Sequence, residues 1–136
     1  MKDITKYQGI IPAFYACYDD NGEISPERVE ALTRHLIAKG VKGVYVGGSS
    51  GECIYQSVAD RKLVLEHVMK AAEGKLTVIA HVACNNTTDS KELAAHAESL
   101  GVDAIAEFLR FISICRSMRS QNTGMIFPVR HRIQTL

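Results

Sequence analysis

The chain has 136 residues, the usual size of one domain, and 46% of them are apolar and 23% charged. A formal net charge of +1 gives no overall field that would attract nucleic acid or an anionic membrane. The stretch MKDITKYQG lacks the apolar segment of a signal peptide, and no apolar run is long enough to span a bilayer. We therefore expect a cytoplasmic protein with no nucleic-acid or membrane partner.

The first predicted elements are a strand and a helix. Residues 9–17 (GIIPAFYAC) are apolar and β-prone, and the turn-forming DDNGE follows them. Ser25 precedes a proline and an acidic residue, which is a typical helix start. Apolar residues then recur at helical spacing, and Gly40 can end the helix.

Two further helix–strand units follow in the same rhythm. Residues 41–47 (VKGVYVG) read as a second strand, and 76–84 (LTVIAHVAC) as a third strand buried on both faces. Ser57 is expected to cap the helix between them, with Val58, Lys62, Leu65 and Met69 on one side and Arg61, Glu66 and Lys70 elsewhere. Gly74 ends this helix.

The last unit resembles the earlier ones. Thr88 is expected to cap a third helix, which Gly101 ends, and residues 102–106 (VDAIA) form the fourth strand. The order βαβαβαβ indicates a parallel sheet with right-handed crossovers. It fits an open doubly wound sheet or the first half of a (β/α)₈ barrel, because a whole barrel takes about 250 residues. We predict residues 1–106 to be half of such a barrel.

The loop GGSSGE at 47–52 follows the second strand, where ligands bind in parallel α/β folds. Glycines let the backbone approach a ligand, and Ser49 and Ser50 add two hydroxyl donors. Such a loop suits a carboxylate or a phosphate, although a tight loop without a ligand has the same composition. It has neither the lysine of a Walker loop nor GxGxxG spacing.

The loop together with its surroundings resembles a known family. YVGGSSGE, the helix start SVADRK and the strand VIAHVAC are similar to the N-acetylneuraminate lyase branch of the pyruvate-dependent class I aldolases. GIIPAFYACYDDNGEI also resembles that family's first strand and turn, although Ala16-Cys17-Tyr18 stands where many members have Thr-Pro-Phe. The related dihydrodipicolinate synthases usually carry GTTGE in this loop. The resemblance covers residues 7–106.

The resemblance implies a (β/α)₈ barrel, commonly a homotetramer, without a metal or cofactor. It implies that a lysine on a later strand forms a Schiff base with a 2-keto acid, pyruvate or sialic acid, and that a tyrosine transfers protons. The reaction is the reversible cleavage of N-acetylneuraminate to N-acetylmannosamine and pyruvate. Carried over to this chain, the carboxylate-binding pair is Ser49 and Ser50, and Ser50 could also orient the tyrosine. No catalytic residue is carried over, because lysine and tyrosine lie beyond the family-like region.

Other candidate residues favour structural roles. His81 beside Cys84 could be a ligand pair, but both lie in or at the end of an apolar strand, which favours packing. Tyr45 reads as barrel filling rather than a proton relay, and Glu52 as a residue that bonds the loop backbone. Three further histidines are expected to be surface or flanking residues: His35, His67 and His96. The cysteines are expected to be buried and reduced, with a disulfide or metal site as the alternative: Cys17, Cys53, Cys84 and Cys115.

The composition changes abruptly near Ala106. Residues 1–106 contain 11 Lys and Arg, 14 Asp and Glu and 14 alanines, whereas 107–136 contain five arginines, one glutamate and no alanine. Where the family continues with a Pro-aromatic stretch, this chain reads EFLRFISIC. With synonymous codons chosen to favour it, a frame displaced by one deleted nucleotide restores a family-like Pro-x-x-Tyr-Phe. We infer a frameshift in the codon after Ala106, in the gene or in its reported sequence.

The tail at 107–136 is accordingly expected to be unrelated to the barrel. Its apolar residues at 108–114 favour a helix against the open sheet edge, and its arginines form only a weak candidate for a nucleic-acid patch. Four strands alone leave a parallel sheet with one uncovered edge. We expect no lyase activity and a strong tendency to aggregate. The alternatives are a fragment of a dihydrodipicolinate synthase or other 2-keto acid aldolase, or a half-barrel that only binds a carboxylate.

Overall fold

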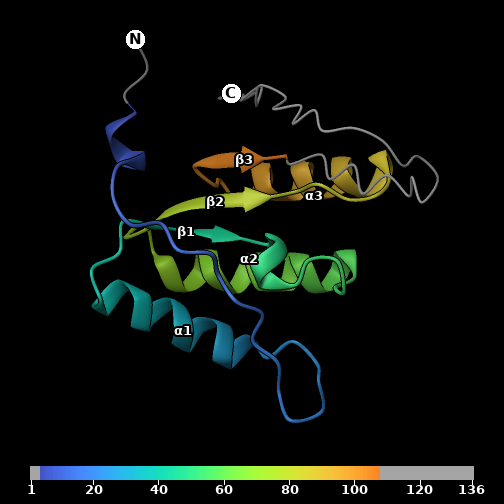
Figure 1. Ribbon diagram of the computed structural model, residues 1–136, viewed down its shortest axis with the longest axis horizontal. Helices are drawn as coiled ribbons and strands as arrows, with labels where there is room; N and C mark the ends of the chain where they lie inside the picture. The colour runs from blue at the N-terminus through green and yellow to red at the C-terminus, as the bar shows by residue number, and fades with distance from the viewer. Residues whose placement is uncertain (1–3, 108–136) are drawn as a thin grey trace, which may run out of the picture.

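The computed structural model describes residues 4–107, which form a parallel sheet covered by helices (Figure 1). The strands are adjacent in sequence order: β1 (Gly43–Val46), β2 (Thr77–His81) and β3 (Ala104–Ala106). The helices are α1 (Pro26–Ala38), α2 (Val58–Ala72) and α3 (Thr87–Ser99), and the short 3₁₀ turns are η1 (Thr5–Tyr7) and η2 (Ser49–Gly51). The predicted tail helix at 108–114, the tail arginines and Cys115 lie outside the described residues.

The first predicted strand is only partly formed. Its segment lies beside β1 with a single parallel bridge, Ala13 to Tyr45, and the Tyr45 amide donates to the Pro12 carbonyl at 2.9 Å. Toward the N-terminus, the next bond joins the Lys42 amide to the Ile10 carbonyl. The donor of this bond is three residues before Tyr45, whereas its acceptor is only two residues before Pro12. This slip and the missing N–H of proline prevent a regular ladder. The segment nevertheless occupies the place of a strand next to β1.

The ends of α1 and α2 confirm the sequence prediction. The Ser25 hydroxyl accepts a hydrogen bond from the Arg28 amide at 3.3 Å. Ser57 and Asp60 form a reciprocal capping box, which satisfies two amides at the start of α2. Gly40, after α1, has a φ of +75°, a conformation that favours glycine.

The predicted cap of the third helix was wrong by two residues. Asn86, not Thr88, precedes α3, and its side-chain oxygen accepts from the Asp89 amide at 2.8 Å. Thr88 lies inside the first turn. Asparagine and threonine are both good caps, so residue type alone could not separate them.

The helices cover only one face of the sheet. Side chains that alternate along β1 and β2 are buried beneath the helices, with exposed fractions of 5% or less: Val44, Val46, Val78, Ala80 and Val82. The intervening residues of β2 are half-buried, so the prediction of a strand buried on both faces was wrong. Helices on one face and strands in sequential order match a barrel segment, whereas a doubly wound sheet carries helices on both faces.

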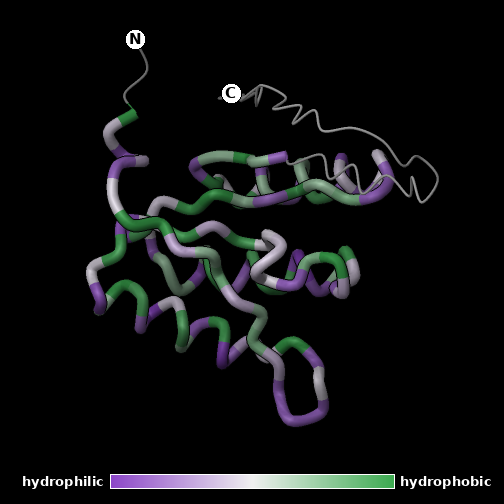
Figure 2. Tube along the Cα trace, in the orientation of Figure 1, coloured by the Kyte–Doolittle hydropathy of each residue, from purple (hydrophilic) through white to green (hydrophobic). Residues whose placement is uncertain are grey.

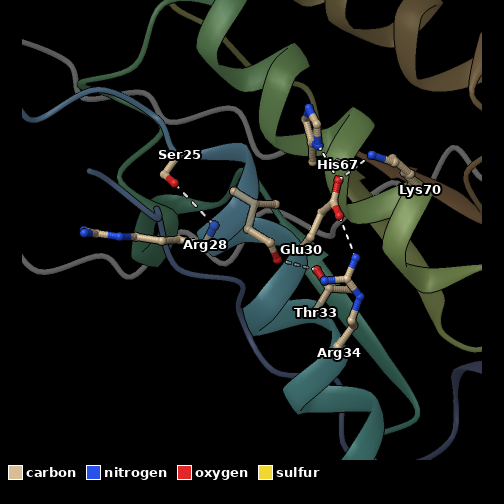
Figure 3. A network of polar contacts seen from close by, with 8 residues as sticks. Ser25, Arg28, Glu30, Thr33, Arg34, His67 and Lys70 are labelled. Atoms are coloured by element: carbon tan, nitrogen blue, oxygen red, sulfur yellow. Dashed lines mark hydrogen bonds and ion pairs between the residues drawn. The ribbon is translucent and has the colours of Figure 1, made fainter. Parts of the chain in front are cut away.

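The interface between α1 and α2 contains a polar cluster around Glu30 (Figure 3). Its carboxylate accepts from Arg34 at 2.6 Å and contacts His67 and Lys70 at 2.8 Å each. The hydrogen bond from Lys70, then those from His67 and Arg34, lowers the pKa of Glu30 to about 2. The cluster pins the partly exposed edges of the two helices together.

The N-terminal turn η1 packs against the amino-terminal ends of β2 and β3. The Tyr7 hydroxyl donates to the Asp103 carbonyl at 2.8 Å, and the Lys6 ammonium contacts the Asp103 carboxylate at 2.9 Å. The same carboxylate accepts from the Val78 amide at 2.9 Å. Residues 97 positions apart in sequence are thus joined at the start of β2 and β3.

Hydropathy follows this layout (Figure 2). The strands are mostly apolar, whereas the turn after the first segment is hydrophilic and projects from the body of the domain. In that turn the Asp19 carboxylate accepts from the amides of Asn21 and Glu23 at 2.8 and 3.0 Å, which confirms the predicted DDNGE turn. No helix within residues 4–107 combines the length and apolar content needed to cross a membrane.

Candidate functional site

The loop after β1 is a short 3₁₀ turn placed at the carboxyl end of the sheet. The Gly51 amide donates to the Gly48 carbonyl at 3.0 Å, and the Glu52 amide donates to the Ser49 carbonyl at 3.1 Å. The chain leaves the turn through Glu52, whose φ of 60° is left-handed. These bonds fix the backbone without using any serine side chain.

Two glycines in the loop are required by close packing. A Cβ at Gly51 would lie 2.5 Å from the carbonyl oxygen of Phe14, which is backbone and cannot rotate away. A Cβ at Gly48 would lie 2.7 Å from the Tyr45 ring. The loop therefore sits directly against the first segment and against β1, and Ser49 and Ser50 are the two side chains between these glycines.

Ser49 and Ser50 occupy those positions, and both are exposed. Within residues 4–107, neither their hydroxyls nor their backbone amides have a hydrogen-bond partner. Four donors from two consecutive residues are thus open at the end of a parallel strand. Such a group can receive the oxygens of a carboxylate or phosphate.

Arg61 on α2 lies beside Gly47, the first residue of the loop. Its side chain, in a residue only 5% exposed, reaches the end of β2, where it donates to the carbonyls of His81 at 2.7 Å and Ala83 at 3.0 Å. It also contacts the Cys84 sulfur at 3.1 Å. Within the described residues no carboxylate pairs with this guanidinium. Its uncompensated positive charge favours an anion near the adjacent loop.

The Arg61 side chain also borders a small cavity of about 10 Å³, together with Gly47, His81 and other residues. Its Nε is buried without a partner within the described residues. A cavity of this size has room for about one water molecule, and such a water is the usual way to satisfy a buried donor. The sequence pattern placed Arg61 away from the apolar side of the helix, so periodicity missed the burial of this residue.

His81 connects β2 to the loop. Its Nδ1 lies 2.8 Å from the Gly47 carbonyl oxygen, which can only accept, so Nδ1 carries the proton. The 3.4 Å contact between Nδ1 and an Arg61 nitrogen is therefore between two donors and is not a hydrogen bond. Burial, opposed by the bond to Gly47 and reinforced by Arg61, lowers the pKa of His81. A neutral His81 thus orients the residue that opens the loop.

Tyr45 and Glu52 show which other predictions hold. The Tyr45 ring packs 6.0 Å from the His81 ring, centre to centre, and burial raises the pKa of its hydroxyl. This supports packing rather than proton transfer. Glu52 closes the turn through its backbone amide, whereas its exposed side chain makes no bond within residues 4–107, so the predicted side-chain bond to the loop was wrong.

The histidines and cysteines have structural neighbours. His35 is exposed, while His67 and His96 contact Glu30 and Glu66 at 2.8 Å each, as expected for flanking residues. Residues 4–107 contain no group of three side chains suited to a metal ion. Three cysteines are free and only partly buried, rather than fully buried as predicted: Cys17, Cys53 and Cys84.

Comparison with known proteins decides the family. The sequence model of the dihydrodipicolinate synthetase family matches residues 6–111. The chain belongs to this family. It is 76% identical over 106 residues to the N-acetylneuraminate lyase of Mediterraneibacter gnavus, covering 78% of this chain and 34% of that protein. The lyase of Citrobacter koseri is 41% identical over 104 residues, covering 76% and 35%.

Solved structures agree with the sequence comparison. A catalytic-lysine mutant of the Ruminococcus gnavus sialic acid aldolase matches with a TM-score of 0.78 and 75% identity, over 79% of this chain and 35% of that one. The Mycoplasma synoviae N-acetylneuraminate lyase matches with a TM-score of 0.75 and 33% identity, over 77% and 36%. The fold is therefore the N-terminal part of a (β/α)₈ aldolase barrel, as predicted. The chain spans about a third of the length of the curated relatives that it matches.

Proposed function

We propose that this chain is the carboxylate-binding part of an N-acetylneuraminate lyase, whose complete form cleaves sialic acid to N-acetylmannosamine and pyruvate. The observation that carries the proposal is the set of donors on Ser49 and Ser50 at the carboxyl end of β1, which have no partner within residues 4–107. The identity to two lyases supports the substrate class. The homotetramer and cytoplasmic location implied by the family belong to the same proposal.

The mechanism gives this loop a binding role. The two hydroxyls and two amides donate to the carboxylate of a 2-keto acid, and the buried Arg61 charge strengthens this attraction. The neutral His81 keeps Gly47 in place beneath the loop. Held by its carboxylate, the keto carbon would face the interior of the barrel. No metal or cofactor is part of this mechanism.

The proposal also states that the chain alone does not catalyse the reaction. A Schiff base needs a lysine whose amine faces the keto carbon. Lys75 lies just before β2, at the opposite end of the sheet from the loop, and its ammonium contacts Glu73 at 2.8 Å. Lys91 is exposed on α3. No strand within residues 4–107 carries a lysine, so none of the described lysines matches the role. Borohydride reduction in the presence of pyruvate is therefore expected to leave the chain unmodified.

A second candidate function is that of a dihydrodipicolinate synthase or another 2-keto acid aldolase. One such synthase structure matches with a TM-score of 0.68 at 31% identity. The loop sequence GGSSGE and the 76% identity to a lyase favour sialic acid as the substrate. A carboxylate-binding half-barrel without any catalytic role would retain the same loop chemistry.

Binding of pyruvate to the whole chain tests the proposal. We expect pyruvate to shift the amide resonances of residues 48–51 in NMR titrations, and its uncharged methyl ester to shift them at least tenfold less. The double variant Ser49→Ala/Ser50→Ala should weaken pyruvate binding at least tenfold. The matched control Ser99→Ala, on the exposed end of α3, should not. Equal binding of the ester, or shifts confined to other residues, contradicts the proposal.

We also propose that the tail at 107–136 arises from one missing nucleotide after the codon of Ala106. The loss of alanine and lysine from that point supports a change of frame. Sequencing of genomic DNA and messenger RNA across codons 106 to 108 tests this. An intact frame that encodes Glu107 and Phe108 without a missing base contradicts it.

A further inference from the structure

The sheet has an open face opposite the helices. Its residues follow from the register, since Tyr45 pairs with Ile79, Ile79 with Ala104, and His81 with Ala106. All five side chains point away from the buried valines of the covered face, and all five residues remain partly accessible. Within residues 4–107 no helix packs over this face, although the loop at Gly48 lies against the Tyr45 ring. Three of the five are apolar (Ile79, Ala104 and Ala106), and none of the five is an acid, a lysine or an arginine. The five residues are referred to below as the open face.

The open face continues into an open edge at β3. The Ala106 carbonyl accepts from the Val82 amide at 3.0 Å, so the polar groups of Ala106 point toward β2. Because these groups alternate along a strand, the N–H and C=O of Ile105 point the other way. Within the described residues β3 pairs only with β2. The next strand of a sequential parallel sheet belongs beside Ile105.

We propose that the open face and the β3 edge bind, as a separate polypeptide, the remaining two thirds of a lyase of this family. The relatives contain this same fold as about a third of a longer chain, with a TM-score of 0.78 for one of them. The missing part would supply parallel βα units, and hence both a strand for the edge and apolar side chains for the face. This inference depends on packing alone and not on the proposed chemistry of the loop.

Co-refolding tests this directly. The whole 136-residue chain and the part of the Mediterraneibacter gnavus lyase that follows its matched region are unfolded together in urea and diluted. We expect a soluble one-to-one complex by native mass spectrometry. Hydrogen exchange at the Ile105 amide should slow at least tenfold relative to the chain alone. Failure to recover such a complex from the joint refolding overturns the proposal.

Two matched alanine-to-aspartate variants test whether the open face contacts the added polypeptide. Ala104→Asp puts a charge on the open face and should weaken the complex at least tenfold, whereas Ala95→Asp, at an exposed position on α3, should leave it unchanged. Equal effects of the two variants overturn the proposal. So does an Ile105 amide already protected in the chain alone, since residues 108–136 or a second copy would then occupy the edge.

Enzyme activity separates this inference from the proposed function. The complex should cleave sialic acid, and the same complex made with a catalytic-lysine mutant partner should form equally well without activity. A one-to-one complex that fulfils the exchange criterion but stays inactive supports the packing inference. That result would count against the role proposed for Ser49 and Ser50.

Discussion

The two faces of the sheet differ in what this chain supplies to them. On the covered face Val44 and Val78 are 0% and 1% exposed, because α1, α2 and α3 contribute apolar side chains to the same layer. On the open face Tyr45, Ile79 and His81 are only partly buried. The difference shows that within residues 4–107 the helices cover one face of the sheet and leave the other face partly exposed.

The strongest test of this difference compares two alanine substitutions, one on each face of the sheet. Phe14, which is 1% exposed, packs in the covered core, and Phe14→Ala should lower the free energy of unfolding by about 3–5 kcal/mol. Ile79→Ala on the open face should cost about 1 kcal/mol, because its side chain already contacts water. Urea unfolding of chain refolded at low concentration measures both. Equal losses would show that the open face is covered.

The buried guanidinium gives the next largest effect. Arg61→Met leaves the His81 and Ala83 carbonyls without their donor and should destabilise the chain by about 3 kcal/mol. It should also weaken pyruvate binding, because the charge beneath the loop is lost. Lys62→Met, which removes only a partly exposed ion pair with Glu92, should cost at most about 1 kcal/mol. Thermal unfolding with and without pyruvate distinguishes the variants, and an undiminished affinity in Arg61→Met would contradict the electrostatic role.

A smaller effect is expected at the start of α3. Asn86→Ala removes the side-chain acceptor for the Asp89 amide and should cost about 1 kcal/mol. Thr88→Ala should change stability by less than about 0.5 kcal/mol, since that hydroxyl caps nothing. Unfolding midpoints of the two variants decide between the caps, and a larger loss for Thr88→Ala would reverse the assignment.

The smallest effect concerns acid stability. The pKa of Glu30 is about 2 in the folded chain, below its ordinary value of 4.5, so its contribution is fully present above pH 4.5. That contribution is lost as the pH falls from 4.5 toward 2. Glu30→Gln should therefore flatten the decline of stability over this range, and the exposed control Glu98→Gln should not. Stability against pH, followed by circular dichroism, measures this; parallel curves for Glu30→Gln and the parent chain would contradict it.

Local chemistry in the sequence predicted most of the fold. Ser25 and Ser57 start helices because their side chains bond to nearby amides, and that information lies within four residues. Periodicity failed at Arg61, since its burial depends on carbonyls of Ala83 and His81, about 20 positions away. It failed also for the first strand, where a slip of register beside Pro12 limits the ladder to one bridge.

The position of the candidate site was predictable from the sequence, but the residues that pack around its loop were not. Glycine and serine after a short strand located the loop, and Ser49 and Ser50 lie there without a hydrogen-bond partner among the described residues. The residues beneath the loop could not be found in the same way. His81 and Arg61 acquire their neighbours only when β2 is laid beside β1 and α2 is packed over them.

The contacts of Lys6 and Tyr7 with Asp103, at the start of β3, constrain the order in which this polypeptide can fold. Lys6 and Tyr7 leave the ribosome early, but their partner Asp103 is synthesised 97 and 96 residues later. Loop closure over such a span is slow, because its entropic cost precedes any gain from contact. The turn at Lys6 and Tyr7 is therefore among the last parts of the domain to become ordered. A stalled nascent chain without Asp103 should expose that turn to proteases.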